Sequence, residues 1–133
     1  PNTIHSQFLI GSLTKSFVAV AVMKLVEEKK VHLHEPIATY LPNLKKELAD
    51  GLTIHYLMKQ QSGLEASFDK LTEYEIMDIT PAELLAIINT SKRSFKPGEK
   101  YQYTNINFAL LAMVIEVVTG TSYQQYLQQA IFN

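Results

Sequence analysis

The sequence contains no cysteine and no tryptophan, and its formal net charge is −1. Without cysteine the chain has no disulfide, no thiolate nucleophile and no thiolate metal ligand. Cysteine usage therefore does not indicate whether the protein works in an oxidising or a reducing compartment. Near-neutral charge gives no support to a nucleic-acid or anionic-membrane partner, so we expect neither. The apolar run in the first helix is interrupted by Lys24, is too short to span a bilayer, and lacks the flanks of a signal peptide.

Length and composition fit one globular domain with a mainly helical structure. The chain has 133 residues, of which 47% are hydrophobic, enough to form one buried core. Apolar periodicity, caps and terminating glycines predict helices and little strand. Residues 45–51 are expected to be a polar connection and residues 64–79 an irregular loop. The expected helices span residues 12–28, 54–60, 81–89, 106–118 and 122–131, with a helical turn at 37–40.

Individual residues set the expected helix boundaries. No glycine follows the first helix, so Lys29 or Lys30 must make the turn, with a positive φ where glycine is usual. Thr80 is an expected N-cap, and Glu83 can complete a capping box with it. Gly63 is expected to close the helix that starts near residue 54.

The most informative segment is the entry to the first helix, where Gly11 precedes Ser12 and Lys15. Three-residue spacing places the serine and lysine side chains on one face of the helix. A cation at a helix N-terminus also opposes the helix dipole. The helix is apolar on nearly every side from Phe17 to Val26, which predicts burial in the centre of the domain. A polar serine and a cation at the start of a buried helix break these local rules, and such violations are typical of functional sites.

This serine and lysine suit nucleophilic catalysis. A serine hydroxyl becomes a good nucleophile when a neighbouring base takes its proton. Lysine is a base in its neutral form, which burial and the positive end of a helix favour. The same helix end favours negative charge at the reaction centre, and Gly11 would let a substrate approach closely. The alternative is structural: Ser12 caps the helix, and Lys15 extends its ammonium group to water.

The Ser-x-x-Lys pattern alone is weak, because Ser67 and Lys70 match it as well. That second copy is expected in an irregular loop with no long apolar helix behind it, so we assign it no catalytic role. His32, His34 and Glu35 could suggest a metal site, but no further ligand has suitable spacing. We therefore expect surface histidines, no metal and no cofactor.

A second constellation, Tyr103 and Asn105, stands directly before the long C-terminal apolar helix. In an extended segment, residues two apart point the same way, so the phenol and the carboxamide can enter one cleft. A tyrosine near cations can act as an acid or a base, and an asparagine can orient an amide ligand or the lysine. The alternative is a packed tyrosine beside a helix N-cap formed by Asn105.

Together these motifs resemble the penicillin-recognising serine enzymes, namely class C β-lactamases, D-Ala-D-Ala carboxypeptidases and related esterases. The resemblance implies Ser12 as the acylated nucleophile and Lys15 as its proton partner. It further implies Tyr103 as the acid and base and Asn105 as a contact to the substrate amide. The resemblance runs along nearly the whole chain and is carried by residues 8–17 (Phe-Leu-Ile-Gly-Ser-Leu-Thr-Lys-Ser-Phe), 61–64 (Gln-Ser-Gly-Leu), 95–105 and 119–127.

The resemblance also implies an incomplete copy of the family's site. The family's third motif, Lys-Thr-Gly or His-x-Gly on a strand, would supply the second oxyanion donor and would follow Asn133. We therefore expect residues 1–133 to be the helical subdomain of the α/β serine β-lactamase/DD-peptidase fold, lacking most of the sheet. Gln60 and Gln61 stand where the family has His-Thr, and Lys29 stands where glycine is common.

Three functional hypotheses follow from these residues. The first is a serine hydrolase with an acyl-enzyme mechanism on small-molecule or peptide amides or on esters. The resemblance places it in the periplasm, in the cell envelope or outside the cell. The second is a non-catalytic helical binding module, or pseudoenzyme, that keeps the scaffold. The third is a piece that folds only with a missing C-terminal segment or a complementary chain, or by swapping with its own copies, because its cleft side would otherwise expose apolar surface.

Overall fold

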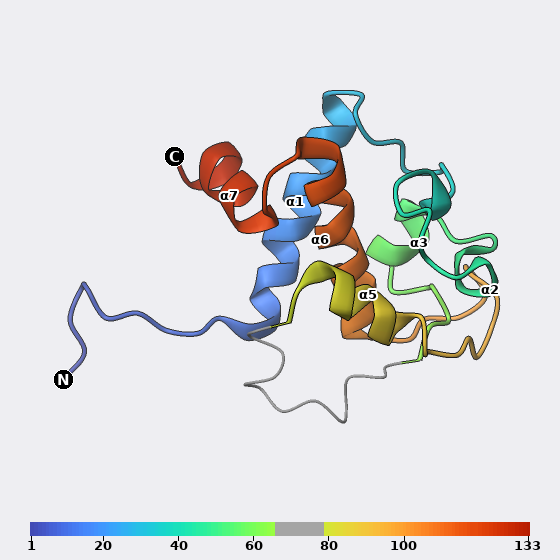
Figure 1. Cartoon of the computed structure of the whole chain (residues 1–133). Coiled ribbons are helices and arrows are strands. Elements are labelled where there is room, and N and C mark those ends of the chain that lie inside the picture. Colours follow the sequence, from blue (N-terminus) through green and yellow to red (C-terminus); the bar gives the residue numbers. More distant parts are fainter. Residues whose placement is uncertain (66–78) are drawn as a thin grey trace.

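The computed structural model describes residues 1–65 and 79–133. Two long helices, α1 (Thr14–Glu27) and α6 (Asn105–Thr119), pack side by side in the centre (Figure 1). The short helices α3 (Ile54–Met58) and α7 (Tyr123–Leu127) pack against α6, and α7 also contacts α1. Residues 1–10 extend away from the helices as a lead-in (Figure 1). The long helices therefore form the centre of the fold, as expected.

The remaining elements are short helical segments. They are η1 (Gly11–Leu13), η2 (Ile37–Thr39), α2 (Lys46–Ala49), α5 (Pro81–Ile88) and the π-helical η4 (Gln128–Phe132). The described residues contain two isolated β-bridges, Pro36–Thr53 and Leu64–Arg93, and no strand. The expectation of a mainly helical chain is therefore confirmed. Residues 66–78 lie outside the described part, and with them most of the expected loop and the second Ser-x-x-Lys copy.

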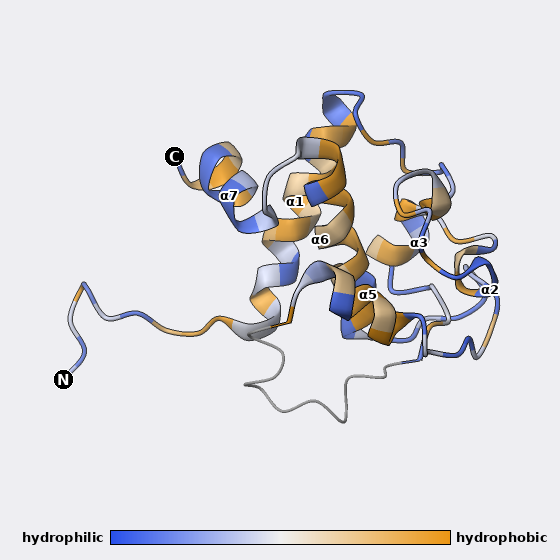
Figure 2. Cartoon of the chain, in the orientation of Figure 1, coloured by the Kyte–Doolittle hydropathy of each residue, from blue (hydrophilic) through white to orange (hydrophobic). Residues whose placement is uncertain are grey.

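The core lies between α1, α3 and α6, where the hydrophobic residues of these helices gather (Figure 2). Burial of such side chains contributes roughly 1.5–3 kcal/mol each relative to exposure. This core fixes the first turns of α1 and α6 relative to each other. The largest fully buried side chains are Val22, Leu25, Ile37, Leu52, Ile54, Leu57, Leu64, Ile88, Ile106, Leu110, Leu111 and Ile115.

The expectation that α1 is buried on all sides is wrong. Val18, Val22 and Leu25 are buried, but Val20 and Met23 are 54% and 44% exposed. The physical reason is incomplete coverage, because α1 contacts η1, α6, α7 and η4, and these elements leave Val20 and Met23 partly uncovered. One face of α1 therefore presents apolar side chains to the surface.

The end of α1 is closed by Lys29, as the absence of glycine predicted. Lys29 has a φ of 57°. Its N–H donates to the carbonyl of Val26 at 3.0 Å, and the N–H of Lys30 donates to the carbonyl of Leu25 at 2.9 Å. These two hydrogen bonds form a Schellman motif. The lysine adopts a left-handed conformation that normally costs a non-glycine residue about 1–2 kcal/mol.

The expected capping box at the start of α5 is confirmed. The hydroxyl of Thr80 accepts from the N–H of Glu83 at 3.3 Å. In return, the Glu83 carboxylate accepts from the N–H of Thr80 at 2.9 Å. The helix ends at Ile88, one residue before the expected end. Gly120 ends α6 with a φ of 70°, also as expected.

Two local expectations are wrong. Residues 45–51 contain the helix α2, because Leu48 and Ala49 point into the core and give the segment a buried face. Gly63 does not close α3. The helix ends at Met58, and Gln60 takes the left-handed conformation with a φ of 56°.

In the described residues, no single helix is long and apolar enough to cross a bilayer. Helix α6 and the segment from α7 to η4 are long and apolar enough only when taken together, and that pair is bent by 77°.

Candidate active site

Four side chains converge where α1 and α6 begin. Ser12 lies in η1, Lys15 in the first turn of α1, Tyr103 in the extended segment before α6, and Asn105 at the first position of α6. The Ser12 Oγ is 2.7 Å from the Tyr103 Oη. The Lys15 Nζ is 3.1 Å from the Ser12 Oγ and 2.8 Å from the Asn105 Oδ1. The structure therefore brings together all four predicted site residues.

Ser12 does not cap the helix. Neither η1 nor α1 has a side-chain cap at its N-terminus, and the Ser12 hydroxyl contacts Lys15 and Tyr103 instead. Gly11 adopts a φ of 53°, which explains the glycine, and the space beside it is open. The structural alternative for Ser12 is therefore wrong.

Lys15 does not extend to water. Its ammonium group donates to the Ser12 hydroxyl and to the side-chain oxygen of Asn105. It also lies 5.0 Å from the centre of the Tyr103 ring, within the range of a cation–π interaction. The structural alternative for Lys15 is therefore wrong as well, because its ammonium group contacts three site residues.

Tyr103 is perturbed by its neighbours. The polar interaction with the Lys15 ammonium, in the first place, and the hydrogen bond with Ser12 lower the pKa of the Tyr103 phenol from its ordinary value. Partial burial acts in the opposite direction and is the weaker effect. The side chain is 50% exposed, so the phenol is open to solvent while it contacts the serine. A lowered pKa increases the fraction of phenolate, the form that can accept a proton, near neutral pH.

Thr104, and not Asn105, caps α6. The Thr104 hydroxyl accepts from the N–H of Ile106 at 3.3 Å. The Asn105 side chain is thus left to accept from Lys15, and the alternative of an Asn105 cap is wrong. A threonine directly before the helix was the signal for this cap, because threonine is a common N-cap residue.

Gln60 was not among the site residues predicted from the sequence. Its side chain accepts from the backbone N–H of Thr104, which follows Tyr103 in the sequence. A glutamine carries no distinctive sequence signal for such a role. Its function depends on a contact between segments 44 residues apart, which only the fold reveals.

The histidines form no metal site among the described residues, where no group of three or more potential metal ligands comes together. His34 packs against His55, with ring centres 4.8 Å apart. Glu35 accepts a hydrogen bond from the Tyr40 hydroxyl at 2.9 Å. His34 and Glu35 thus contact neighbouring side chains of the fold.

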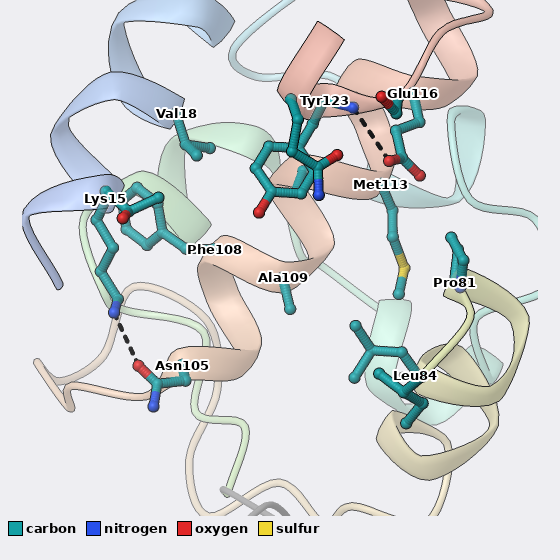
Figure 3. Close-up of a pocket in the computed structure, with 15 residues that line it drawn as sticks. Lys15, Val18, Pro81, Leu84, Asn105, Phe108, Ala109, Met113, Glu116 and Tyr123 are labelled. Carbon is teal, nitrogen blue, oxygen red and sulfur yellow. Dashed lines mark hydrogen bonds between the residues drawn. The ribbon is translucent and has the colours of Figure 1, made fainter. Parts of the chain in front are cut away.

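A largely apolar cavity of about 620 Å³ adjoins the site between α1, α5, α6 and the start of α7. Lys15 and Asn105 border it at one end, joined by their hydrogen bond (Figure 3). Met113 and Leu84 lie toward the other end (Figure 3). The polar site therefore opens next to an apolar space.

Comparison with known proteins assigns the helical fold to a class, that of β-lactamases and penicillin-binding proteins. A family model described as Beta-lactamase matches residues 1–133. The chain therefore belongs to the β-lactamase family and represents a helical part of that fold.

Curated relatives support this assignment. Protein flp of Staphylococcus aureus (strain MW2) is 32% identical over 130 residues, which cover 92% of this chain and 25% of that protein. The putative penicillin-binding protein PbpX of Bacillus subtilis (strain 168) is 29% identical over 131 residues, covering 98% of this chain and 32% of that protein. The chain thus spans about a quarter to a third of the length of these relatives.

Solved structures share the same helical arrangement. The D-amino acid amidase from Ochrobactrum anthropi SV3 is 30% identical with a TM-score of 0.87, over 99% of this chain and 38% of that one. The octameric penicillin-binding protein homologue from Pyrococcus abyssi is 33% identical with a TM-score of 0.79, over 92% of this chain and 30% of that one. The fold expected from the sequence is therefore confirmed.

Proposed function

We propose that this protein is a serine hydrolase that acts through an acyl-enzyme on amide or ester substrates, either small molecules or peptides. The observation that carries the proposal is the hydrogen bond of 2.7 Å between the hydroxyls of Ser12 and Tyr103, with the Lys15 ammonium 3.1 Å from the same serine oxygen. This arrangement provides a nucleophile, a proton acceptor and a cation within one hydrogen-bonded group.

In the acylation step, the Ser12 oxygen attacks the substrate carbonyl carbon and its proton passes to the Tyr103 phenolate. Lys15 donates to the serine oxygen, so the serine hydroxyl proton is free to point toward Tyr103. The Lys15 cation assists this transfer, because it lowers the pKa of Tyr103 and so favours the phenolate that accepts the proton. The tetrahedral intermediate then expels its amine or alkoxide, which takes the proton from Tyr103, and the acyl group stays on Ser12.

In the deacylation step, Tyr103 accepts a proton from water while the water oxygen attacks the acyl carbon. Collapse of the second intermediate releases the acid, and the proton returns to the Ser12 oxygen. The N–H of Ser12 is a natural oxyanion donor, because the first N–H groups of a helix lack intrahelical partners. We assign the Asn105 carboxamide a contact to the substrate amide, and its oxygen accepts from Lys15.

The names of the relatives support the choice of substrate class. One neighbouring structure is a D-amino acid amidase with L-phenylalanine amide, and a curated relative is named as a putative penicillin-binding protein. We therefore propose amides, including β-lactams, as the first substrates to test. From the family resemblance, we propose that residues 1–133 are part of a single catalytic domain in the cell envelope, the periplasm or the cell exterior.

The natural gene product that contains this chain tests the proposal. It is incubated with a chromogenic cephalosporin, a D-Ala-D-Ala peptide, D-phenylalanine amide and a p-nitrophenyl ester. We expect turnover of at least one of them, and Ser12→Ala should lower kcat by at least about 10³-fold. The substrate that is turned over decides between β-lactamase, peptidase, amidase and esterase.

Ser16→Ala provides the matched control, because Ser16 is an exposed serine on the same helix. This variant should retain the kcat of the unmodified protein. Full activity of Ser12→Ala would overturn the assignment of the nucleophile. A folded gene product that turns over none of the four substrates would instead favour the non-catalytic binding module.

A further inference from the structure

We propose that Gln60 is a positioning residue that holds the backbone on both sides of Tyr103. The backbone carbonyl of Gln60 accepts from the N–H of Gln102 at 2.9 Å. Its side-chain Oε1 accepts from the N–H of Thr104 at 3.1 Å. A single residue thus binds the two peptide groups that flank the tyrosine. The kinetic part of this inference rests on the proposed function, whereas the structural part does not.

These contacts are buried and specific. Gln60 is 6% exposed, Thr104 is 4% exposed and Asn107 is fully buried. The orientation of the Gln60 amide is determined, because the Thr104 N–H can only donate and must face the oxygen. The same oxygen also accepts from the Asn107 Nδ2 at 2.6 Å. Removing this acceptor would leave two buried donors without a partner.

The backbone of Gln60 contributes as much as its side chain. Its left-handed conformation, with a φ of 56°, ends α3 and turns the chain toward the segment before α6. The next residue, Gln61, extends the contact, because its carbonyl accepts from the N–H of Gly98 at 2.8 Å. Residues 60 and 61 therefore form a platform beneath the segment 98–104 that carries Tyr103.

The platform matters because the Tyr103 side chain is only half-buried. Its position beside Ser12 depends on where its backbone is held. Among the described residues, Lys15 on α1 is the charged group that acts on the Tyr103 phenol. A displaced backbone would move the phenol away from that cation and from the serine hydroxyl. Its pKa would then rise toward the ordinary value, and proton transfer with Ser12 would slow.

The first experiment measures the pKa of the Tyr103 phenol by carbon-13 NMR in the natural gene product labelled at the tyrosine ζ-carbon. The sequence has seven tyrosines, and Tyr103→Phe identifies the resonance. Gln60→Met keeps the length of the side chain but removes the acceptor, and we expect the pKa to rise. Gln61→Met is the matched control, because Gln61 contributes its backbone carbonyl and not its side chain, and it should leave the pKa unchanged. A folded Gln60→Met with an unchanged pKa would overturn the proposal.

Gln60→Asn covers the case in which Gln60→Met does not fold. Asparagine tolerates a left-handed backbone, but its shorter side chain withdraws the oxygen from Thr104. It should raise the pKa of Tyr103 in the same direction, and an unchanged value would again overturn the proposal. These readouts need no catalytic turnover, so their failure is distinguishable from a failure of the proposed function.

The second experiment measures the rate of Ser12 acylation by p-nitrophenyl acetate. Gln60→Met should lower this rate roughly 10- to 100-fold, because small displacements of reacting groups carry costs of that order. The rising limb of its pH profile should move to higher pH. Gln60→Glu retains an acceptor oxygen and should recover at least part of the rate. Equal rates and pH profiles for Gln60→Met and the unmodified protein would contradict a positioning role.

Discussion

Lys15 and Asn105 are joined by a hydrogen bond of 2.8 Å across 90 residues of sequence. The contact ties the first turn of α1 to the first turn of α6. It also fixes the lysine ammonium between Ser12 and Tyr103, the two hydroxyls whose proton exchange the proposed mechanism requires. The position of this cation therefore determines how readily Tyr103 ionises.

Lys15→Met is predicted to raise the pKa of Tyr103, because the Lys15 cation is the main cause of its lowered value. A raised pKa reduces the phenolate fraction at every pH below the new value. The rising limb of the pH–rate profile should therefore shift to higher pH. Tyrosine-selective NMR titration measures the pKa directly. Lys24→Met, later on the same helix, is the control and should leave the phenol unchanged, and an equal effect of both substitutions would refute the account.

Lys29→Gly is predicted to stabilise the protein by about 1 kcal/mol, because glycine adopts the left-handed conformation without the penalty that lysine bears. The φ of 57° and both Schellman hydrogen bonds should be retained. Denaturant unfolding measures the change. Lys29→Ala removes the same side chain but keeps a Cβ atom, so it should not show this gain.

Gly63→Ala is predicted to destabilise the protein by about 2 kcal/mol or more. A Cβ atom at this position would lie 2.1 Å from the backbone oxygen of Phe95, at a φ of 74°. Gly51→Ala is the matched control. Its φ of 67° is similar, but no atom lies within 4 Å of the added carbon, so it should cost only about 1 kcal/mol of backbone strain. Equal losses for both variants would show that the close approach to Phe95 is unimportant.

The sequence predicted those parts of the structure that depend on local rules. The capping box of Thr80 and Glu83 and the terminating Gly120 lie where their residue types indicate. The turn at Lys29 was predictable, because no glycine was available to end α1. The four site residues were predicted from their spacing and order, and the structure brings them together. Their catalytic roles remain proposals.

The rest depends on contacts between distant segments, which a local pattern does not encode. The exposure of Val20 and Met23 depends on which elements cover each face of α1. The helix at 46–49 depends on the core that buries Leu48. The role of Gln60 depends on a segment 44 residues away. In each case the missing information was the tertiary partner.

The central claim is that Ser12 is the nucleophile, and mass spectrometry of the covalent adduct tests it most directly. The natural gene product is incubated with a fluorescent penicillin and separately with a p-nitrophenyl ester, digested, and searched for an acylated peptide. We predict an adduct on Ser12 that is absent from Ser12→Ala and unchanged in Ser67→Ala, which removes the second Ser-x-x-Lys serine. An adduct on another residue, or labelling that persists in Ser12→Ala, would contradict the account.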